Sequence, residues 1–345
     1  MRVTIREVAR AAGVSVATVS RVLNESGPVA GDTRDRIRRV AGEMRYIPNG
    51  AARSLSMRRT GTLGVLLPDL YGEFFSEVIR GLDQAAQRAR FQLLLSSSHN
   101  SRHDIEAALQ AMRGRVDGLV VMSPHIDVAV LAANLPESLP AVMLNTAQAT
   151  EAFDTLGVDN FGGARAMVAH LAGHGHRRIA IVRGPEPNHD AQERLRGYRA
   201  ALAGAGIAPD PALEAEGDFT EDGGYGAVRR LLALDAPPTA IFAANDSTAI
   251  GAMSALRDAG ISIPRGVAVA GFDDIPIARY VTPALSSVRV SISDLGARAM
   301  EQLVRAVEQE NRHLRTHQTL ATALVIRDSC GAHPPAAEPA GRGPP

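Results

Sequence analysis

Cysteine, lysine and long apolar runs are scarce or absent in this chain of 345 residues. Cys330 is the single cysteine, so no disulfide can form within the chain, which favours a reducing compartment. No apolar run approaches the roughly 18 residues that a membrane-spanning helix needs. The amino terminus is amphipathic and charged, and it lacks the apolar core of a signal peptide. We therefore expect a cytoplasmic protein without a membrane partner.

Lysine is absent altogether, and all 37 basic residues are arginine, which we attribute to codon usage. The 37 acidic residues balance this charge overall, but the distribution is uneven. Residues 1–60 contain 12 Arg against 5 Asp and Glu, a net charge of +7 that leaves −7 on the rest of the chain. A basic amino-terminal module on an acidic body is typical of a polyanion-binding protein. The alternative is an ordinary solvated charged surface.

The basic segment begins with a pattern typical of two short helices joined by a tight turn. Apolar residues recur at i, i+3, i+4 and i+7 from Ile5 to Ala12, which predicts one apolar stripe along a first helix. Gly13 can adopt the backbone angles of a sharp stop. Ser15 can cap a second helix, because its hydroxyl accepts hydrogen bonds from free N–H groups of the first turn.

The second predicted helix has an exposed face of short side chains and one arginine. Its inward residues are expected to be Val19, Val22 and Leu23, and its outward residues Val16, Ala17, Thr18, Ser20, Arg21 and Asn24. Side chains of this size on an exposed helix fit the major groove of DNA. Thr33 is expected to cap a third helix over residues 34–44, which would complete a small three-helix bundle.

A short segment after the bundle predicts a conditional helix. Pro48 blocks extension of the third helix, and Asn49 is a good N-cap for a new one. The piece over residues 51–55 is so short that helix nucleation makes it marginal by itself. Leu55 lies among polar residues, which an ordinary linker does not need. The segment therefore suggests a switch, with an ordinary linker as the alternative.

These motifs together resemble the DNA-binding head and hinge of the lactose/galactose repressor (LacI/GalR) family. The specific signature is Val14-Ser15-x-x-Thr18-Val19-Ser20-Arg21-Val22-Leu23-Asn24, followed by Tyr46-Ile47-Pro48-Asn49 and Ala52-Arg53-Ser54-Leu55. The resemblance implies a homodimer on double-stranded operator DNA, with a hinge leucine wedged into the minor groove. The implied DNA-binding residues are Thr4, Ser15, Val16, Ala17, Thr18, Ser20, Arg21, Asn24, Asn49, Ala52 and Leu55.

From residue 62 onward, apolar strands alternate with helices. The strands are expected near Leu63, Leu93, Gly118, Ala141, Ile179, Ala240 and Val267, and the helices over 75–89, 105–113, 162–172, 191–205, 224–234, 247–259 and 292–308. Near-continuous apolar strands indicate parallel sheets that helices cover on both faces. About 270 residues exceed what one core normally holds, so two lobes are expected.

This body is similar to a type I periplasmic-binding-protein fold, with crossovers near 158–161, 288–292 and 319–323. The predicted fold class is an all-α helix-turn-helix domain with a hinge helix, followed by a two-lobed α/β domain with parallel sheets. The expected domains are a DNA-binding domain (1–48), a hinge helix and linker (49–60), an effector-binding and dimerisation domain (61–330) and a disordered Pro/Ala/Gly tail (331–345).

Ligands of parallel sheets bind at the carboxyl ends of the strands. The candidate effector-binding residues at these ends are Phe74, Phe75, Asn145, Asp190, Arg194, Phe219, Asn245 and Asp273. They supply the hydrogen-bonding groups and the aromatic face that a sugar requires. As alternatives, Asp246 and Asp274 can serve only as helix caps. Many family members carry Asp where this chain has Asn145, which leaves a nucleoside or another small polar metabolite open.

Metal and catalytic sites are disfavoured. His170, His174 and His176 lie close together, but no nearby Cys or carboxylate completes a ligand set. No nucleophile elbow or phosphate-binding loop indicates an enzyme, and no cofactor is expected. We predict a non-enzymatic transcriptional repressor whose operator affinity is controlled by a small polar effector such as a sugar. The alternatives are a transport-type sugar-binding protein, an enzyme on the same fold, and an activator or corepressor-dependent regulator with a nucleoside-like ligand.

Overall fold

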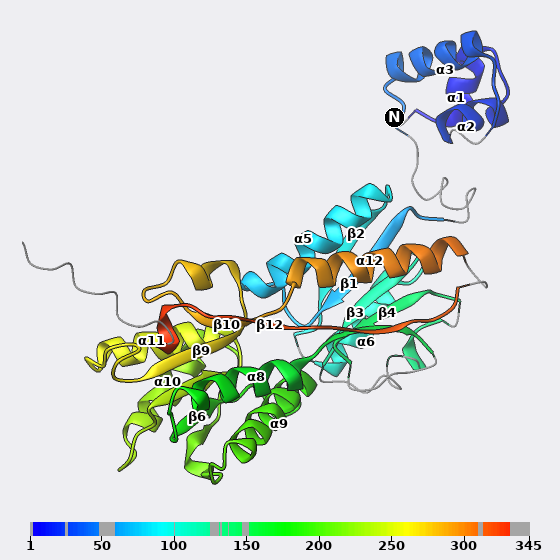
Figure 1. Cartoon of the computed structure of the whole chain (residues 1–345). Helices are drawn as coiled ribbons and strands as arrows, with labels where there is room; N and C mark the ends of the chain where they lie inside the picture. Colours follow the sequence, from blue (N-terminus) through cyan, green and yellow to red (C-terminus); the bar gives the residue numbers. More distant parts are fainter. Residues whose placement is uncertain are drawn as a thin grey trace, which may run out of the picture. The chain divides into compact units, whose positions relative to one another are not determined.

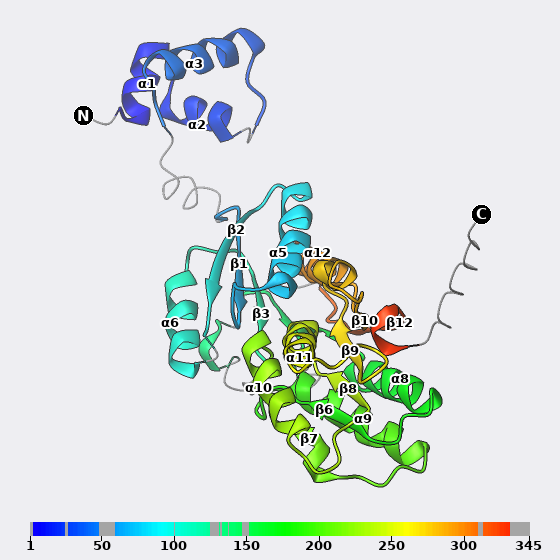
Figure 2. The same ribbon diagram turned by 90° about the vertical axis from the view of Figure 1, so that its left-hand side faces the viewer.

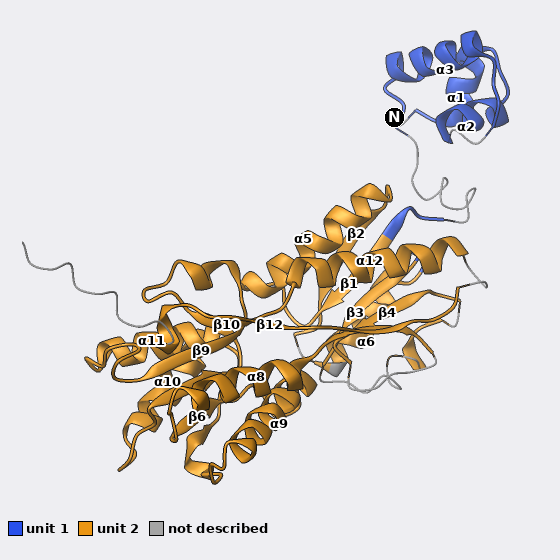
Figure 3. Cartoon of the chain, viewed as in Figure 1, with its two compact units in different colours: residues 1–62, 114–117 blue, residues 63–113, 118–345 orange. Residues whose placement is uncertain are grey.

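The computed structural model describes residues 3–24, 27–47, 59–99, 101–124, 131, 133–136, 138–146, 152–309 and 313–331. The chain divides into two compact units, residues 1–62 with 114–117 and residues 63–113 with 118–345 (Figure 3). The predicted hinge residues Asn49, Ala52 and Leu55, and the tail from residue 332 onward, lie outside the described residues. In the part of the chain that is described, no helix is long and apolar enough to cross a membrane.

The described residues of the first unit form the helices α1 (Ile5–Ala12), α2 (Val16–Asn24) and α3 (Gly31–Glu43). Fully buried Val8, Val19 and Ile37, one from each helix, form the centre of its small core. The turn between α1 and α2 depends on Gly13, which has φ 64° and ψ 36° as predicted. Residues 114–117 also belong to this unit, and the Asp117 carboxylate accepts hydrogen bonds from the backbone N–H groups of Thr60 (2.6 Å) and Gly61 (2.8 Å).

The helix starts in this unit were predicted with mixed success. The Ser15 hydroxyl accepts a hydrogen bond from the backbone N–H of Thr18 at 3.1 Å, which confirms the predicted cap of α2. The predicted cap of α3 at Thr33 was wrong. The backbone N–H of Arg34 already bonds to the carbonyl of Ala30 at 3.0 Å, so Thr33 lies inside the first turn of a helix that starts at Gly31.

The second unit contains two six-stranded sheets, each the centre of one lobe (Figures 1 and 2). The first sheet has the order β11-β5-β4-β3-β1-β2. Its strands are β1 (Thr62–Leu67), β2 (Gln92–Ser97), β3 (Leu119–Met122), β4 (Ala141–Leu144), β5 (Asp154–Val158) and β11 (His317–Leu320). From β1 through β3, β4 and β5 to β11 the pairing is parallel.

The second sheet has the order β12-β10-β9-β8-β6-β7. Its strands are β6 (Ile179–Val182), β7 (Glu214–Ala215), β8 (Ala240–Ala243), β9 (Ala268–Asp273), β10 (Ser286–Arg289) and β12 (Ala323–Val325). Its pairing is parallel from β7 to β10, and β12 is antiparallel to β10. The strands β6, β8 and β9 are buried along their whole length, as expected for strands covered on both faces.

Helices cover both sheets, and several pack in pairs. Their bounds are α5 (Glu73–Arg88), α6 (Arg102–Met112), α8 (Asn160–Gly173), α9 (His189–Gly204), α10 (Glu221–Leu232), α11 (Asp246–Asp258) and α12 (Ile292–Gln309). The pairs are α5 with α12, α8 with α9, and α10 with α11. In the first pair, a Cβ on Gly81 would overlap the carbonyl of Ser293, and one on Gly296 would overlap the carbonyl of Val78. Glycine at both positions therefore permits close approach of the two backbones.

The chain passes between the lobes three times. The strand β5 of the first sheet leads into α8, which packs in the second lobe, and β10 of the second sheet leads back into α12 of the first lobe. The third passage joins β11 to β12. These passages lie where the sequence predicted crossovers, near 158–161, 288–292 and 319–323. The predicted two-lobed parallel α/β fold is confirmed.

Candidate functional site

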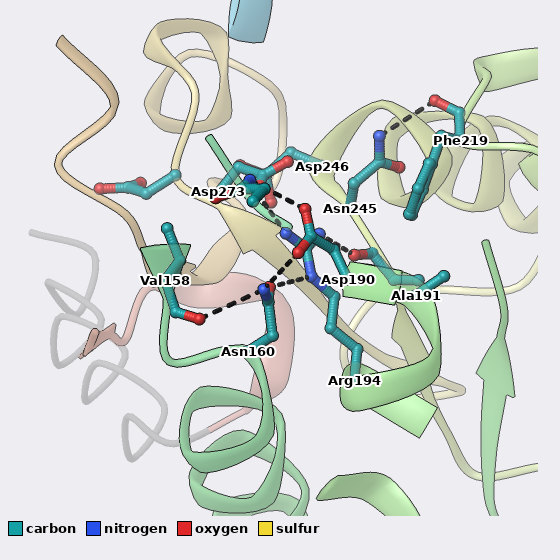
Figure 4. A network of polar contacts seen from close by, with 12 residues as sticks. Val158, Asn160, Asp190, Ala191, Arg194, Phe219, Asn245, Asp246 and Asp273 are labelled. Atoms are coloured by element: carbon teal, nitrogen blue, oxygen red, sulfur yellow. Dashed lines mark hydrogen bonds and ion pairs between the residues drawn. The ribbon is translucent and has the colours of Figure 1, made fainter. Parts of the chain in front are cut away.

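Five polar side chains form one buried network, and Figure 4 labels four of them, Asn160, Asp190, Arg194 and Asp273. Asn145 follows β4, and Asn160 begins α8 directly after β5. Asp190 and Arg194 lie in the first turns of α9, and Asp273 ends β9. None of the five is more than 7% exposed. The fold therefore brings residues from both lobes together at the carboxyl ends of parallel strands, where such folds bind ligands.

Asp190 joins the two lobes within this network. Its Oδ2 atom accepts a hydrogen bond from Asn145 Nδ2 at 2.8 Å, and its Oδ1 atom accepts one from Asn160 Nδ2 at 2.9 Å. Burial raises the pKa of Asp190, and the nearby positive charge of Arg194 opposes this shift. The contact from Asn145 is one of the hydrogen bonds that link the first lobe to the second.

Arg194 donates hydrogen bonds to three other groups at this site. Its Nε donates to Asn160 Oδ1 at 2.8 Å, its Nη1 to the carbonyl of Ala244 at 2.6 Å and its Nη2 to Asp273 Oδ1 at 3.1 Å. The guanidinium carbon lies 3.8 Å from the ring centroid of Phe272, so the planar group stacks on an aromatic face. The ring centroid of Phe219, in the segment between β7 and α10, lies 5.8 Å from the same carbon.

Asp273 and Asp246 are buried carboxylates, and Asp273 pairs with this arginine. Burial raises the pKa of Asp273 to about 6, while Arg194 lowers it and the charge of Asp190 raises it further. Burial also raises the pKa of Asp246, and the neighbouring Asp273 adds to that shift. Both carboxylates are therefore held in an environment that penalises their charge.

Three predicted effector residues have backbone angles that are unusual for their side chains. Asn145, Phe219 and Asp273 have φ values of 49°, 69° and 103°. Such angles are uncommon outside glycine, and for a bulky residue such as phenylalanine they are rare. Backbone strain of this kind concentrates at binding and catalytic sites, where the surrounding structure maintains it.

The remaining predicted effector residues form separate contacts. Asn245 caps α11 by accepting a hydrogen bond from the backbone N–H of Thr248 at 2.9 Å, and its Nδ2 donates to the carbonyl of Phe219 at 3.0 Å. Phe74 and Phe75, at the start of α5, form an edge-to-face pair with ring centroids 5.4 Å apart. Among the described residues, no hydrogen bond or ring contact joins these two rings to the network.

The structure corrects the alternative that Asp246 and Asp274 serve only as caps. Asn245 takes the N-cap position, and the Asp246 carboxylate instead accepts hydrogen bonds from Ser287 Oγ at 2.6 Å and from the backbone N–H of Ile275 at 2.8 Å. Asp274 pairs with Arg289 and Arg327, each at 2.7 Å. Both carboxylates therefore hold the segments around β9 and β10 in place.

Two residues of the network were missed by the sequence analysis. Asn160 bridges Arg194 and Asp190, and Phe272 supplies the ring under the guanidinium. The signal that could have indicated Asn160 is its position directly behind a strand that ends at Val158. That strand was not predicted, so its end could not be searched for polar residues.

The three histidines form no metal site in the described residues, where no group of three or more His, Cys, Asp or Glu side chains could hold a metal ion. The rings of His170 and His174 are 4.5 Å apart, and Nε2 of His170 lies 3.5 Å from Sγ of Cys330. Burial lowers the pKa of His170, and the charge of His174 lowers it further.

The outward face of α2 has the composition that the sequence predicted. Val16 is 40% exposed, and Ala17 and Arg21 are also exposed, whereas Val19 and Val22 are buried. Thr18, Ser20 and Asn24 of this helix are half-buried, and Ser15 just before it is exposed. Ser15 Oγ lies 2.8 Å from Thr18 Oγ1, and Asn24 Nδ2 donates to Ser20 Oγ at 3.1 Å. Thr4 caps α1 in a reciprocal capping box with Glu7.

Known proteins resemble this chain over nearly its whole length. The ribose operon repressor of Haemophilus influenzae is 33% identical over 338 residues, which cover 94% of this chain and 98% of that protein. The Lac repressor dimer bound to operator and the anti-inducer ONPF matches with a TM-score of 0.87 and 28% identity, covering 96% of this chain and 99% of that one. The complex of the transcriptional regulator CelR with cellobiose matches with a TM-score of 0.72 and 33% identity, covering 95% and 100% of the two chains.

Two family models match separate parts of the chain. The model for bacterial regulatory proteins of the lacI family matches residues 4–49, and the model for a periplasmic binding protein-like domain matches residues 168–330. The helix-turn-helix, the two parallel sheets and the whole-length relatives lead to one conclusion. The chain belongs to the LacI family of bacterial regulatory proteins.

Proposed function

We propose that this chain is a transcriptional repressor that binds operator DNA as a homodimer and responds to a small sugar. The observation that carries the DNA-binding part is the exposed face of α2, where Val16, Ala17 and Arg21 point outward from a basic three-helix unit. An arginine on such a face suits bidentate contact to a guanine, and the two aliphatic side chains suit a thymine methyl group. The operator-bound Lac repressor supports this assignment by its similarity over the whole chain.

The other implied DNA contacts complete this proposal. Thr4, Thr18, Ser20, Asn24 and Asn49 fix the register on the phosphates, and Leu55 in the hinge enters the minor groove. Ser15 and Ala52 complete the proposed DNA-binding set. Operator affinity falls steeply with salt, because arginine contacts to phosphates release counterions. Since Val16 and Ala17 cannot hydrogen-bond through their side chains, much of the selectivity comes from Arg21, from half-site spacing and from the kink at Leu55.

The proposed effector site is the buried network around Arg194. Its members from both lobes, Asn145, Asp190, Arg194 and Asp273, bind the sugar hydroxyls, with Phe74, Phe75, Phe219 and Asn245 around them. A bound sugar changes operator affinity only if it binds the two conformations of the chain unequally, and such coupling is typically about 1–3 kcal/mol. The names of the ribose operon repressor and of the CelR–cellobiose complex support a sugar.

The proposed organisation assigns residues 1–48 to DNA binding, 49–60 to the hinge and linker, 61–330 to effector binding and dimerisation, and 331–345 to a disordered tail. We place this regulator in the cytoplasm, where operator DNA is found, and assign it no catalytic activity. The support for both statements is that the matched relatives are transcriptional regulators.

Selection of bound fragments from random DNA, followed by fluorescence anisotropy on the selected operator, tests the DNA-binding part. Arg21→Ala is expected to weaken binding by about 1–3 kcal/mol and to relax preference at one base pair of each half-site. Arg10→Ala is the matched control, because it removes the same charge from α1 and should weaken all sequences alike. If the selection enriches no sequence, or if Arg21→Ala binds the selected operator as tightly as the wild type, the proposal is wrong.

A screen of sugars against the protein–operator complex tests the effector part. A sugar that lowers operator affinity is an inducer, and one that raises it is a corepressor. Asp273→Asn should weaken the response, because it removes a carboxylate acceptor from the network. Sugar turnover that disappears in the same variant would instead identify an enzyme.

A further inference from the structure

The buried network has more negative than positive groups. Asp273 pairs with the guanidinium of Arg194, whose positive charge also acts on Asp190. A third buried carboxylate, Asp246, lies close enough for the charge of Asp273 to act on it. The charge of half-buried His189, the first residue of α9, also acts on Asp190. When Asp190 and Asp273 are ionised they outnumber the one guanidinium, and a new negative charge at this position would meet net repulsion in a poorly solvated environment.

Arg194, the buried cation of this network, is already engaged by the protein. Arg194 donates to a side-chain amide, a backbone carbonyl and a carboxylate, and the ring of Phe272 covers one face of its guanidinium. An anionic ligand that took over this arginine would leave the carboxylate of Asp273 buried without its partner, which is costly. The arginine therefore neutralises the protein's own acids and is poorly placed to neutralise a ligand's.

The unused hydrogen-bonding capacity of the site consists mainly of acceptors. Asn145 Oδ1 is buried and has no hydrogen-bond partner, because the Nδ2 atom of the same amide faces Asp190. The hydroxyl of Thr146, the next residue, is also buried and unpartnered, and it can donate as well as accept. On Asp273, only Oδ1 has a hydrogen-bond partner among the described residues. Acceptors of this kind are satisfied by the O–H groups of a ligand, whereas phosphate and carboxylate oxygens are themselves acceptors.

From this charge balance and these free acceptors, we propose that the effector is a polyhydroxylated molecule without a phosphate or carboxylate group. This inference rests on the effector site proposed above, and it narrows the site to sugars and polyols that carry no negative charge. Phosphorylated sugars and sugar acids are rejected by like-charge repulsion, which is a common source of specificity at desolvated sites.

Isothermal titration calorimetry of the full-length protein with matched pairs of compounds tests this inference at pH 7.5. The pairs are D-ribose with ribose 5-phosphate, D-glucose with glucose 6-phosphate and with gluconate, D-galactose with galactose 6-phosphate, and cellobiose with cellobionate. In each pair that binds, the charged member is expected to bind on the order of 100-fold more weakly, because like-charge repulsion opposes its binding. Each tenfold loss of affinity requires only a modest electrostatic penalty.

Two variants connect this discrimination to the network. Asp190→Asn removes one buried carboxylate and should reduce the preference for the uncharged member roughly tenfold. Asp294→Asn is the matched control, because it removes the same charge from an exposed pair with Arg298 on α12 and should leave the preference unchanged. Circular dichroism checks that both variants fold. If Asp190→Asn does not fold, the comparison of charged and uncharged compounds on the wild-type protein still tests the inference.

The possible outcomes separate this inference from the proposed function. Tighter binding of a phosphate or an acid than of its uncharged parent overturns the inference while leaving effector control in place. An unchanged preference in a folded Asp190→Asn variant overturns the electrostatic explanation. If neither member of any pair binds, the sugar-effector site itself is refuted, and the inference falls with it.

Discussion

Replacing Arg194 with methionine should destabilise the two-lobed unit strongly. The change keeps most of the side-chain volume but removes the hydrogen bonds to Asn160, Ala244 and Asp273. It also leaves Asp273, 4% exposed, without its positive partner. Removing one partner of a buried ion pair typically costs about 3–5 kcal/mol, and we expect a loss of this size in the free energy of unfolding.

Urea unfolding followed by far-ultraviolet circular dichroism measures this loss. Arg196→Met is the matched control, since Arg196 lies on the same helix and pairs with Glu193 but has a side chain that is 65% exposed. Exposed pairs contribute about 0–1 kcal/mol, so the control should shift the midpoint only slightly. The double variant Arg194→Met with Asp273→Asn should recover about 1–3 kcal/mol, because the stranded carboxylate is then neutral.

A loss below about 1 kcal/mol for Arg194→Met would refute the reasoning, because the buried pair would then behave like a surface pair. Additivity of the two single changes in the double variant would also contradict it. Additive effects would mean that Asp273 does not depend on Arg194 in the folded chain, although Nη2 and Oδ1 lie 3.1 Å apart.

Three further predictions concern acidity, helix capping and DNA reading. The pKa of Asp273 rises from 3.8 to about 6 on folding. Its contribution to the free energy of unfolding is therefore full below pH 3.8 and falls by about 3 kcal/mol as the pH rises to 6. The decrease of the urea midpoint between pH 4 and 7 should disappear in Asp273→Asn. Thr4→Ala breaks the capping box of α1 and should lower the thermal stability of the three-helix unit by about 1 kcal/mol, whereas an unchanged melting temperature would count against the cap. Changing Val16 and Ala17 together should alter operator preference in a binding selection while effector affinity stays constant, and a fall in effector affinity would contradict this division.

Features that depend on a few neighbouring residues were predicted well. Gly13 stops α1 and Ser15 caps α2 through contacts within three or four positions, so the sequence contains all that is needed to infer them. The buried strands β6, β8 and β9 were recognised because their apolar runs are continuous.

Strands that form through their neighbours were missed. The strand β10 reads Ser-Ser-Val-Arg and β11 reads His-Gln-Thr-Leu, neither of which has an apolar run that predicts a strand. Each is a strand because it pairs with its neighbours in a sheet, β10 with β9 and β12, and β11 with β5. Their existence is a property of the assembled lobes rather than of their own residues.

The sequence by itself determined the helix-turn-helix, the two-lobed parallel architecture, the strand ends that carry Asn145 and Asp273, and the helix that carries Arg194. Only the tertiary structure decided how these side chains connect, because the bonds span 45 positions from Asn145 to Asp190 and 79 from Arg194 to Asp273. Local patterns encode helices and buried strands through interactions between near neighbours. Contacts between distant positions depend on sheet order and lobe packing, and these made Asn160 the bridge of the network.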